Sequence, residues 1–188
     1  MDRYWFFTWR TYGTWLPGSA GFVGNYVTKY GERKSDNVPG ELTAETMPPL
    51  EKYCQNLLVQ PPVYLNSQHA ETLLEQLQET ARYRNRTIDV LAIMPDHIHL
   101  IAGNYGDPDP EKLLNDWKAY ASRALNRLSD WAPPTSRPRW WVIGGSKRIL
   151  RTNPDRVRAI RYVRDQENPL LIWISDEART LIQNQPKH

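Results

Sequence analysis

The sequence has little that could cross-link the chain or anchor it in a membrane. Cys54 is the one cysteine in 188 residues, which excludes an internal disulfide and a zinc cluster built from cysteines. No apolar run approaches the roughly 20 residues that a membrane-spanning helix needs. The segment from Met1 to Arg10 does not have the pattern of a signal peptide. We therefore expect a soluble, cytoplasmic protein in a reducing compartment, without a membrane partner.

Acidic residues are scarce in one segment. Between Arg137 and Arg164, nine basic residues accompany a single acid, Asp155, although the net charge of the whole chain is only +3. A one-sided run of this kind is typical of a surface that binds phosphate backbones, although a solvated helix face can carry part of it. The chain is also rich in tryptophan and tyrosine, whose rings mostly fill cores but can also stack on unpaired bases.

The length and composition predict one domain over residues 1–188. Apolar residues make up 40% and charged residues 24%, which is typical of a globular chain and not of a disordered one. Glycine and proline interrupt the stretch from about residue 13 to 63, which we interpret as a long, irregular N-terminal insertion. Its end, from Glu51 to Leu58, is expected to form a short helix.

Apolar spacing outside the insertion predicts the order strand, helix, strand, strand, helix, strand, helix. The expected ranges are Tyr4–Thr11, Gln68–Arg84 with Ser67 as N-cap, Thr87–Ile93, His97–Ala102, Pro110–Trp131, Arg139–Ile149, and a last helix from Asn153 as N-cap to about Glu167. The first six elements give βαββαβ, an α+β, ferredoxin-like (RRM-like) antiparallel sheet with helices on one face. The last helix and the insertion are additions to it.

His97 and His99 are the sharpest feature of the sequence. Alternate residues of a strand point to the same face, so the two imidazoles are expected side by side, with Ile98 on the other face. This spacing makes a two-nitrogen metal site. A pair of partly exposed strand histidines without a ligand is the alternative, although the chain has only four histidines and these two directly follow a tight turn.

Four segments resemble one known family. The segment 94–101 (MPDHIHLI) is similar to the His-hydrophobic-His signature of the HUH single-tyrosine transposases, a group that includes the REP-associated tyrosine transposases. The segments 8–18 (TWRTYGTWLPG), 140–150 (WWVIGGSKRIL) and 162–167 (YVRDQE) resemble motifs of one branch of that family. Together the matches extend over most of the chain, from Tyr4 to about Leu170.

The resemblance implies a nucleophilic tyrosine on the last helix, which would be the catalytic helix, and a third metal ligand one turn beyond it. Tyr162 and Gln166 match these positions, and as i and i+4 they are expected on one helix face. Tyr162 could instead only flank the stripe of apolar residues that faces the core. Tyr120 is the rival nucleophile. The ion implied by the family is Mg²⁺ or Mn²⁺, whereas imidazole ligands alone would also suit zinc.

The implied activity is metal-dependent cleavage and strand transfer of single-stranded DNA through a 5′-phosphotyrosine intermediate, with recognition of hairpin-forming DNA. Candidate phosphate contacts are Lys147, Arg148, Arg151 and Arg158, and Trp140 or Trp141 is a possible stacking surface. Two alternatives stay open. One is a domesticated hairpin-binding protein without strand transfer, and the other is a small phosphodiesterase that uses metal-activated water. A homodimer is possible.

Overall fold

The computed structural model describes residues 2–20, 25–27, 33–35, 46–128 and 139–185. The chain divides into two compact units, one formed by Met1–Thr11 with Tyr64–His188 and the other by Tyr12–Val63. The second unit covers nearly the same residues as the expected insertion. That the chain forms one domain stays a prediction. Among the described helices, none has the length and apolar character needed to cross a membrane.

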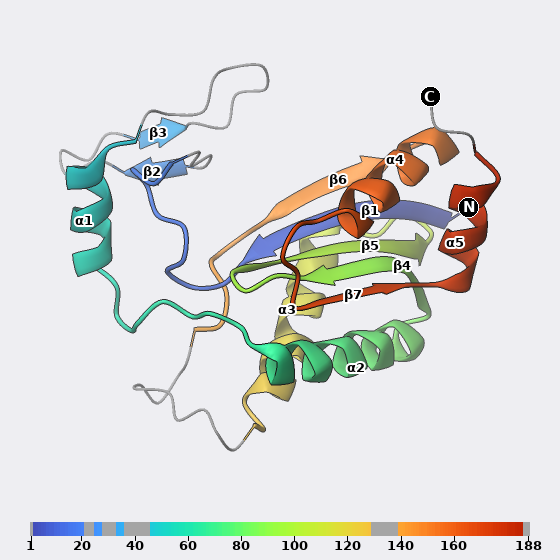
Figure 1. Cartoon of the computed structure of the whole chain (residues 1–188), viewed down its shortest axis with the longest axis horizontal. Coiled ribbons are helices and arrows are strands. Elements are labelled where there is room, and N and C mark those ends of the chain that lie inside the picture. The colour runs from blue at the N-terminus through green and yellow to red at the C-terminus, as the bar shows by residue number, and fades with distance from the viewer. Residues whose placement is uncertain (1, 21–24, 28–32, 36–45, 129–138, 186–188) are drawn as a thin grey trace. The chain divides into compact units, whose positions relative to one another are not determined.

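The first unit is built on a five-stranded sheet with the strand order β6-β1-β5-β4-β7, in which each strand is antiparallel to its neighbours (Figure 1). The strands are β1 (Asp2–Arg10), β4 (Arg86–Ile93), β5 (His97–Tyr105), β6 (Ser146–Leu150) and β7 (Leu171–Ile174). The helices are α2 (Ser67–Tyr83), α3 (Pro110–Leu125), α4 (Asn153–Arg164) and α5 (Asp176–Gln183). The α+β class with an antiparallel sheet is therefore confirmed, and the order of β1, α2, β4, β5, α3 and β6 is the expected βαββαβ.

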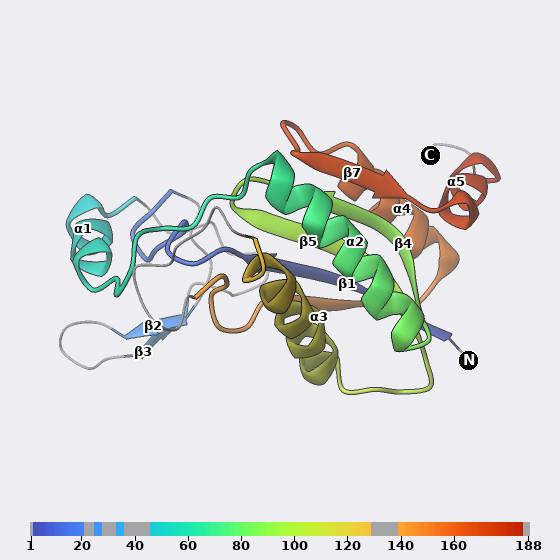
Figure 2. The ribbon, with the colours of Figure 1, turned by 90° about the horizontal axis from the view of Figure 1, so that it is seen from below.

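The helices cover both faces of this sheet. Figures 1 and 2 show α2 and α3 on one face and α4 on the other. The core under α4 and α5 contains Val90 and Ile101 from the strands and Ile160 and Val163 from α4, all of them buried. Because side chains of a strand alternate, the neighbouring residues of the same strands, such as Leu100, point toward α2 and α3. The two βαββαβ helices thus share one face, as expected, and α4 together with α5 packs against the other.

Several element boundaries differ from the expected ones. The N-cap of α2 is Asn66, whose side chain accepts a hydrogen bond from the backbone of His69, and the N-cap of α4 is Thr152. The chain enters β6 only at Ser146, because Gly144 and Gly145 have φ angles of 75° and 149° and turn the backbone away from strand geometry. The helices α3 and α4 end earlier than expected, at Leu125 and Arg164, and Trp131 lies outside the described residues.

Two elements of the first unit were not expected. They are β7, which extends the sheet beside β4, and α5, which follows it. Ser175 forms the N-cap of α5 through a hydrogen bond from the backbone of Ala178. Backbone hydrogen bonds from Leu170 to Ile93 and from Ser175 to Asp89 hold the two ends of β7 against β4. The segment after α4 is therefore part of the sheet and not a tail.

The second unit contains regular elements of its own. The strands β2 (Asn25–Val27) and β3 (Arg33–Ser35) form a two-stranded antiparallel sheet, and α1 spans Pro48–Asn56. The ends of the unit are joined by a hydrogen bond of 2.8 Å from the backbone nitrogen of Val63 to the carbonyl of Tyr12. The expected short helix is thus present, although it begins a few residues before Glu51.

Candidate active site

The two histidines of β5 converge on one point. In the antiparallel register His97 lies opposite Arg10, and His99 lies opposite Thr8, both on β1. Because residues 97 and 99 alternate with Ile98, both rings stand on the face covered by α4. Their Nε2 atoms are 3.1 Å apart and their ring centroids 4.7 Å apart. The two rings therefore point toward one another. A metal ion shared by both imidazoles requires this arrangement.

The spacing of the two nitrogens fits one shared ion. Two nitrogens that each bind a metal at about 2.0–2.1 Å are about 2.8–3.4 Å apart when the angle at the ion is octahedral or tetrahedral, and the Nε2 atoms are 3.1 Å apart. Burial, and then the positive charges of His97 and Arg10, lower the pKa of His99 to about 3. His99 is therefore neutral near pH 7, as a metal ligand must be. Among the described residues no group of three His, Cys, Asp or Glu is arranged to hold an ion.

The second nitrogen of each ring is also occupied. Asp96 Oδ1 lies 2.6 Å from Nδ1 of His97, and Thr8 Oγ1 lies 2.8 Å from Nδ1 of His99. Arg10 Nη1 donates to the other oxygen of Asp96 at 2.7 Å. The hydrogen bond from His97 is the main cause that lowers the pKa of Asp96. Both rings thus use Nδ1 for hydrogen bonds to side chains outside the pair, and their Nε2 atoms lie within hydrogen-bond distance of each other. An ion bound here would replace that hydrogen bond, with each ring oriented through Nδ1 as metal-binding histidines commonly are.

Tyr162 stands beside this pair. Its ring, on α4, is 5.7 Å from the ring of His99 and 5.9 Å from the ring of Phe6, both in edge-on contacts. The side chain is one of the exposed large groups of the protein, with 55% of its surface accessible. The phenol is therefore held next to the histidines on one side and open to a large substrate on the other.

An ion pair fixes the helix that carries Tyr162. Arg156 of α4 donates two hydrogen bonds of 2.5 Å to the carboxylate of Asp89, and its guanidinium lies 3.5 Å from the ring centroid of Tyr4. Asp89 is buried where the register of β4 shifts between Ile88 and Val90. Burial raises the pKa of Asp89, and the hydrogen bonds from Arg156 oppose this change. Because a buried carboxylate is costly without its partner, this pair holds the start of α4 at one place on the sheet.

Gln166 is not placed as expected. The helix α4 ends at Arg164, with Asp165 as its C-cap, so Gln166 lies beyond the helix. The expectation that Gln166 shares a helix face with Tyr162 is therefore wrong. Its side-chain nitrogen instead donates to the backbone carbonyl of Tyr162 at 3.0 Å. Whether its amide oxygen binds an ion stays a prediction.

Tyr120 belongs to a different part of the molecule. It lies on α3, and its ring is 6.5 Å from that of Tyr83 on α2. Figures 1 and 2 show α3 on the face of the sheet opposite α4, and the histidines lie on the face that α4 covers. The structure therefore brings Tyr162, and not Tyr120, to the histidine pair.

The four candidate phosphate contacts are spread over different surfaces. Arg148 stacks on Phe6 at 5.3 Å, on the face of the histidines. Its neighbour Lys147 points to the other face, where Nζ lies 2.5 Å from a carboxylate oxygen of Glu111 on α3. Arg158 is paired with Asp155 in the first turns of α4, and Arg151 is exposed between β6 and α4. Of these four residues, only Arg148 contacts Phe6, whose ring lies beside that of His99.

Both tryptophans that were considered as stacking surfaces are bound to α3. Trp140 is buried, and its Nε1 donates to Asn126 at 2.6 Å. Trp141 is half-buried, and its Nε1 donates to Ser122 Oγ at 2.8 Å. Trp140 therefore has no free ring face, and Trp141 is part of the contact between α3 and the segment before β6.

Four of the residues described above were missed by sequence reasoning: Thr8, Arg10, Asp96 and Phe6. Asp96 had a visible signal, because a carboxylate next to a histidine often orients it. Thr8 and Arg10 alternate on a strand, as the two histidines do, but nothing in the sequence indicates that these strands pair in this register. Phe6 is identified only by its ring contacts with His99 and Tyr162.

Comparisons with known proteins give a distant likeness to solved structures. No family model matches the chain, and no curated protein matches it. Among solved structures it is similar to a REP-associated tyrosine transposase bound to a REP hairpin, with 15% identity, a TM-score of 0.44, and coverage of 86% of this chain and 64% of that chain. The protein thus spans less than two thirds of that chain's length. A likeness at this level shows neither family membership nor activity.

Proposed function

We propose that the protein is a metal-dependent, single-tyrosine DNA nuclease and strand transferase of the HUH type, acting on single-stranded DNA next to hairpin-forming sequence. The observation that carries the proposal is the convergence of three side chains. The Nε2 atoms of His97 and His99 are 3.1 Å apart, and the exposed ring of Tyr162 is 5.7 Å from that of His99. The resemblance of segments 94–101 and 162–167 to that family supports the same assignment.

The two imidazoles are the groups that would hold the ion, Mg²⁺ or Mn²⁺, and Gln166 is the candidate third ligand. When bound, the ion would supply positive charge to the oxygens of the scissile phosphate. Asp96 and Thr8 keep both rings oriented, so that the ligand nitrogens need no rearrangement before a substrate arrives. With only two histidine ligands, coordination positions are left for phosphate oxygens.

Tyr162 is the nucleophile in this proposal. Its phenolic oxygen forms a bond to phosphorus while the bond from phosphorus to the 3′ oxygen breaks. The phenol loses its proton and the departing 3′ oxygen gains one, so no oxidant or cosubstrate is needed. The 5′ phosphate of the downstream strand stays on the tyrosine, which conserves the ester for transfer to another 3′ hydroxyl. In this proposal Arg148, which stacks on Phe6 beside this centre, contacts the phosphate backbone.

The test uses the polarity of the covalent product. A pool of oligonucleotides with a hairpin and randomised single-stranded flanks is labelled at the 3′ end or at the 5′ end and incubated with the protein and Mn²⁺. On denaturing gels only the 3′ label is expected to migrate with the protein, because the downstream strand is the one held by the tyrosine. The adduct is expected in Tyr120→Phe and not in Tyr162→Phe.

Each other outcome rejects part of the proposal. Cleavage without an adduct indicates attack by water, and binding without cleavage indicates a hairpin-binding protein that does not transfer strands. An adduct that persists in Tyr162→Phe and disappears in Tyr120→Phe assigns the nucleophile to the opposite face of the sheet. A 5′-labelled adduct reverses the direction of the chemistry.

A further inference from the structure

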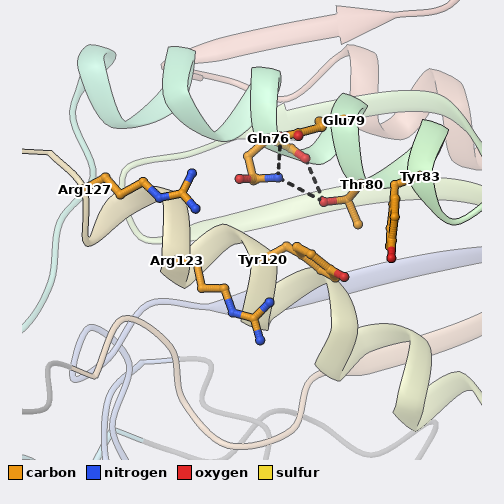
Figure 3. A pocket seen from close by; sticks show the side chains of 7 residues that line it. All are labelled: Gln76, Glu79, Thr80, Tyr83, Tyr120, Arg123 and Arg127. Carbon is orange, nitrogen blue, oxygen red and sulfur yellow. Dashed lines mark hydrogen bonds between the residues drawn. The ribbon is translucent and has the colours of Figure 1, made fainter.

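A groove lies between α2 and α3, on the face of the sheet opposite the histidine pair. Its volume is about 320 Å³, at the lower end of the range of about 300–1,000 Å³ that ligand sites occupy. Figure 3 shows that side chains from both helices line it. They are Gln76, Glu79, Thr80 and Tyr83 from α2, and Tyr120, Arg123 and Arg127 from α3 and the turn after it. The proposed reaction uses none of them.

Spacing along the helices explains why these groups gather. Residues 76, 79, 80 and 83 follow the i, i+3, i+4, i+7 pattern, which forms one stripe on a helix. Residues 120 and 123 are i and i+3 on α3, and 127 lies in the turn directly after that helix. Gln76 and Thr80 are tied to their own helix, since Thr80 Oγ1 donates to the carbonyl of Gln76 at 2.8 Å. The lining side chains that are not bonded to the backbone of their own helix in this way include those at the aromatic and cationic end of the groove.

Flat rings and guanidinium groups alternate at that end. The rings of Tyr83 and Tyr120 are 6.5 Å apart, and the guanidinium of Arg84 lies 5.5 Å and 5.6 Å from their centroids. Arg123 lies 5.2 Å from the centroid of Tyr120. Tyr83 exposes 74% of its surface, so a large part of this aromatic side chain is open to solvent.

The positive charges here exceed the negative ones. Arg123 and Arg127 form no ion pair with any residue in the described part of the chain. Arg84 reaches Asp116 only at 3.6 Å, and Arg86 is closer to that carboxylate, at 2.8 Å. Among the described residues that line the groove, Glu79 is the one acid, and it accepts a hydrogen bond from Gln76.

We propose that this groove binds unpaired nucleotides of the DNA, as a second contact separate from the site of cleavage. Tyrosine rings stack on any base, and arginines without an ion pair in the described part of the chain suit the phosphates between successive bases. An acidic peptide would pair with the arginines but would leave the large exposed surface of Tyr83 uncovered, so a nucleotide fits both features. The choice of DNA as the ligand rests on the proposed function.

The position of the groove sets what this contact can do. The five-stranded sheet separates it from His97 and His99, so the nucleotides held here are not those that react. The groove therefore contributes to how tightly DNA binds and not to the chemical step. Loss of the groove should raise the DNA concentration needed for half-maximal adduct formation and leave the rate at saturating DNA unchanged.

The experiment compares two double variants of the full chain that lose the same groups. Tyr83→Ala with Arg123→Gln removes one ring and one charge from the groove. Tyr105→Ala with Arg179→Gln removes one exposed ring and one exposed charge elsewhere, on β5 and α5. Both substituted pairs are on the surface, and circular dichroism with thermal unfolding verifies that each variant folds. The probe is a fluorescein-labelled thymidine oligonucleotide, followed by anisotropy at several salt concentrations.

The groove variant is expected to bind the oligonucleotide about 10–100-fold more weakly, with the slope of log affinity against log salt reduced by about one. The control variant should stay within about twofold of the wild type. Equal affinities of the two variants overturn the proposal. So does poly-glutamate binding that depends on the groove while thymidine binding does not, because the groove is then a site for an acidic protein.

The two proposals fail in different ways. Oligonucleotide binding that depends on the groove, together with the lack of any covalent adduct, rejects strand transfer and leaves the groove as a DNA site. An adduct that forms at the same half-saturating DNA concentration in both double variants rejects the groove alone. A slower rate at saturating DNA in the groove variant contradicts the separation of the two sites.

Discussion

Asp96 Oδ1 lies 2.6 Å from Nδ1 of His97, and the second oxygen of the same carboxylate accepts a hydrogen bond of 2.7 Å from Arg10. The carboxylate thus holds His97 with Nε2 facing His99, and its negative charge makes the imidazole a better ligand. Arg10 in turn prevents the carboxylate from rotating away. This arrangement orients the proposed metal site without adding a ligand to it.

Asp96→Asn should therefore weaken metal binding while the protein stays folded. The amide oxygen can still accept from His97, but the charge is lost and the amide nitrogen faces Arg10. We expect the affinity for Mn²⁺ to fall about 10–100-fold, measured by isothermal titration calorimetry. Asp107→Asn is the matched control, because this carboxylate is exposed and pairs with Arg3 away from the site. Equal affinities in Asp96→Asn and wild type would contradict the orienting role.

Arg148 and Lys147 are neighbours in the sequence and should differ in their effect on DNA. Arg148 lies over Phe6 on the face of the histidines, whereas Lys147 is paired with Glu111 on the other face. We expect Arg148→Gln to lower the slope of log affinity against log salt by about one. Lys147→Gln should change the slope less, because that ammonium is already paired. Both are measured by anisotropy with a hairpin oligonucleotide, and the opposite ranking would reject our placement of the DNA.

Local patterns in the sequence were enough to predict the βαββαβ order and the shared face of His97 and His99. Alternation along a strand and spacing along a helix are properties of neighbouring residues, so they are visible without a fold. The hydrogen-bond partners of the histidines could not be predicted from such local patterns. Thr8 contacts His99 across 91 positions of sequence, and this contact follows from the pairing of β1 with β5, which no local pattern specifies.

The errors also have physical causes. Gln166 was placed on the helix because i+4 spacing assumes that the helix continues, but α4 ends at Arg164, and Asn168 takes a positive φ of 55° as the chain turns toward β7. The strand β7 itself is four residues long and without alternation, so it could not be distinguished from an apolar tail. Lys147 and Arg148 were both named as candidate phosphate contacts, and they lie on opposite faces of the sheet because adjacent strand residues alternate.

Gly145 and Gly144 provide a matched pair for the segment before β6. Both have positive φ angles, 149° and 75°, so alanine is strained at either position. A Cβ on Gly145 would also come within 2.7 Å of the carbonyl oxygen of Thr8, whereas a Cβ on Gly144 would meet nothing within 4 Å. We expect Gly145→Ala to lower the free energy of unfolding by about 1–3 kcal/mol more than Gly144→Ala, measured by urea denaturation.

The two alanine variants should also differ in their affinity for metal, because Thr8 forms a hydrogen bond with Nδ1 of the proposed ligand His99. A displacement of β1 at Thr8 should reduce Mn²⁺ affinity in Gly145→Ala and not in Gly144→Ala. If the two alanine variants have the same stability and the same metal affinity, the close packing of Gly145 against Thr8 is not important to the site.

The buried side chain of Lys118 should make the free energy of unfolding depend on pH. Its ammonium group is buried and donates to the carbonyls of Val142 and Gly144 at 2.6 Å and 2.9 Å. Burial lowers the pKa of Lys118 from 10.5 to about 8. Below pH 8 both the folded and the unfolded chain hold this proton. Between about pH 8 and 10.5 the unfolded chain holds more of it, so the free energy of unfolding should rise with pH in that window.

Lys118→Met isolates this contribution, since all other titrating groups are common to both proteins. Methionine keeps the length of the side chain but leaves the two carbonyls without their donor, so the variant should be less stable at every pH. The difference in the free energy of unfolding between wild type and variant, from urea titrations, should be flat below about pH 8 and increase above it. A difference that decreases over the same range would mean that the carbonyl hydrogen bonds outweigh burial and raise the pKa of Lys118 instead.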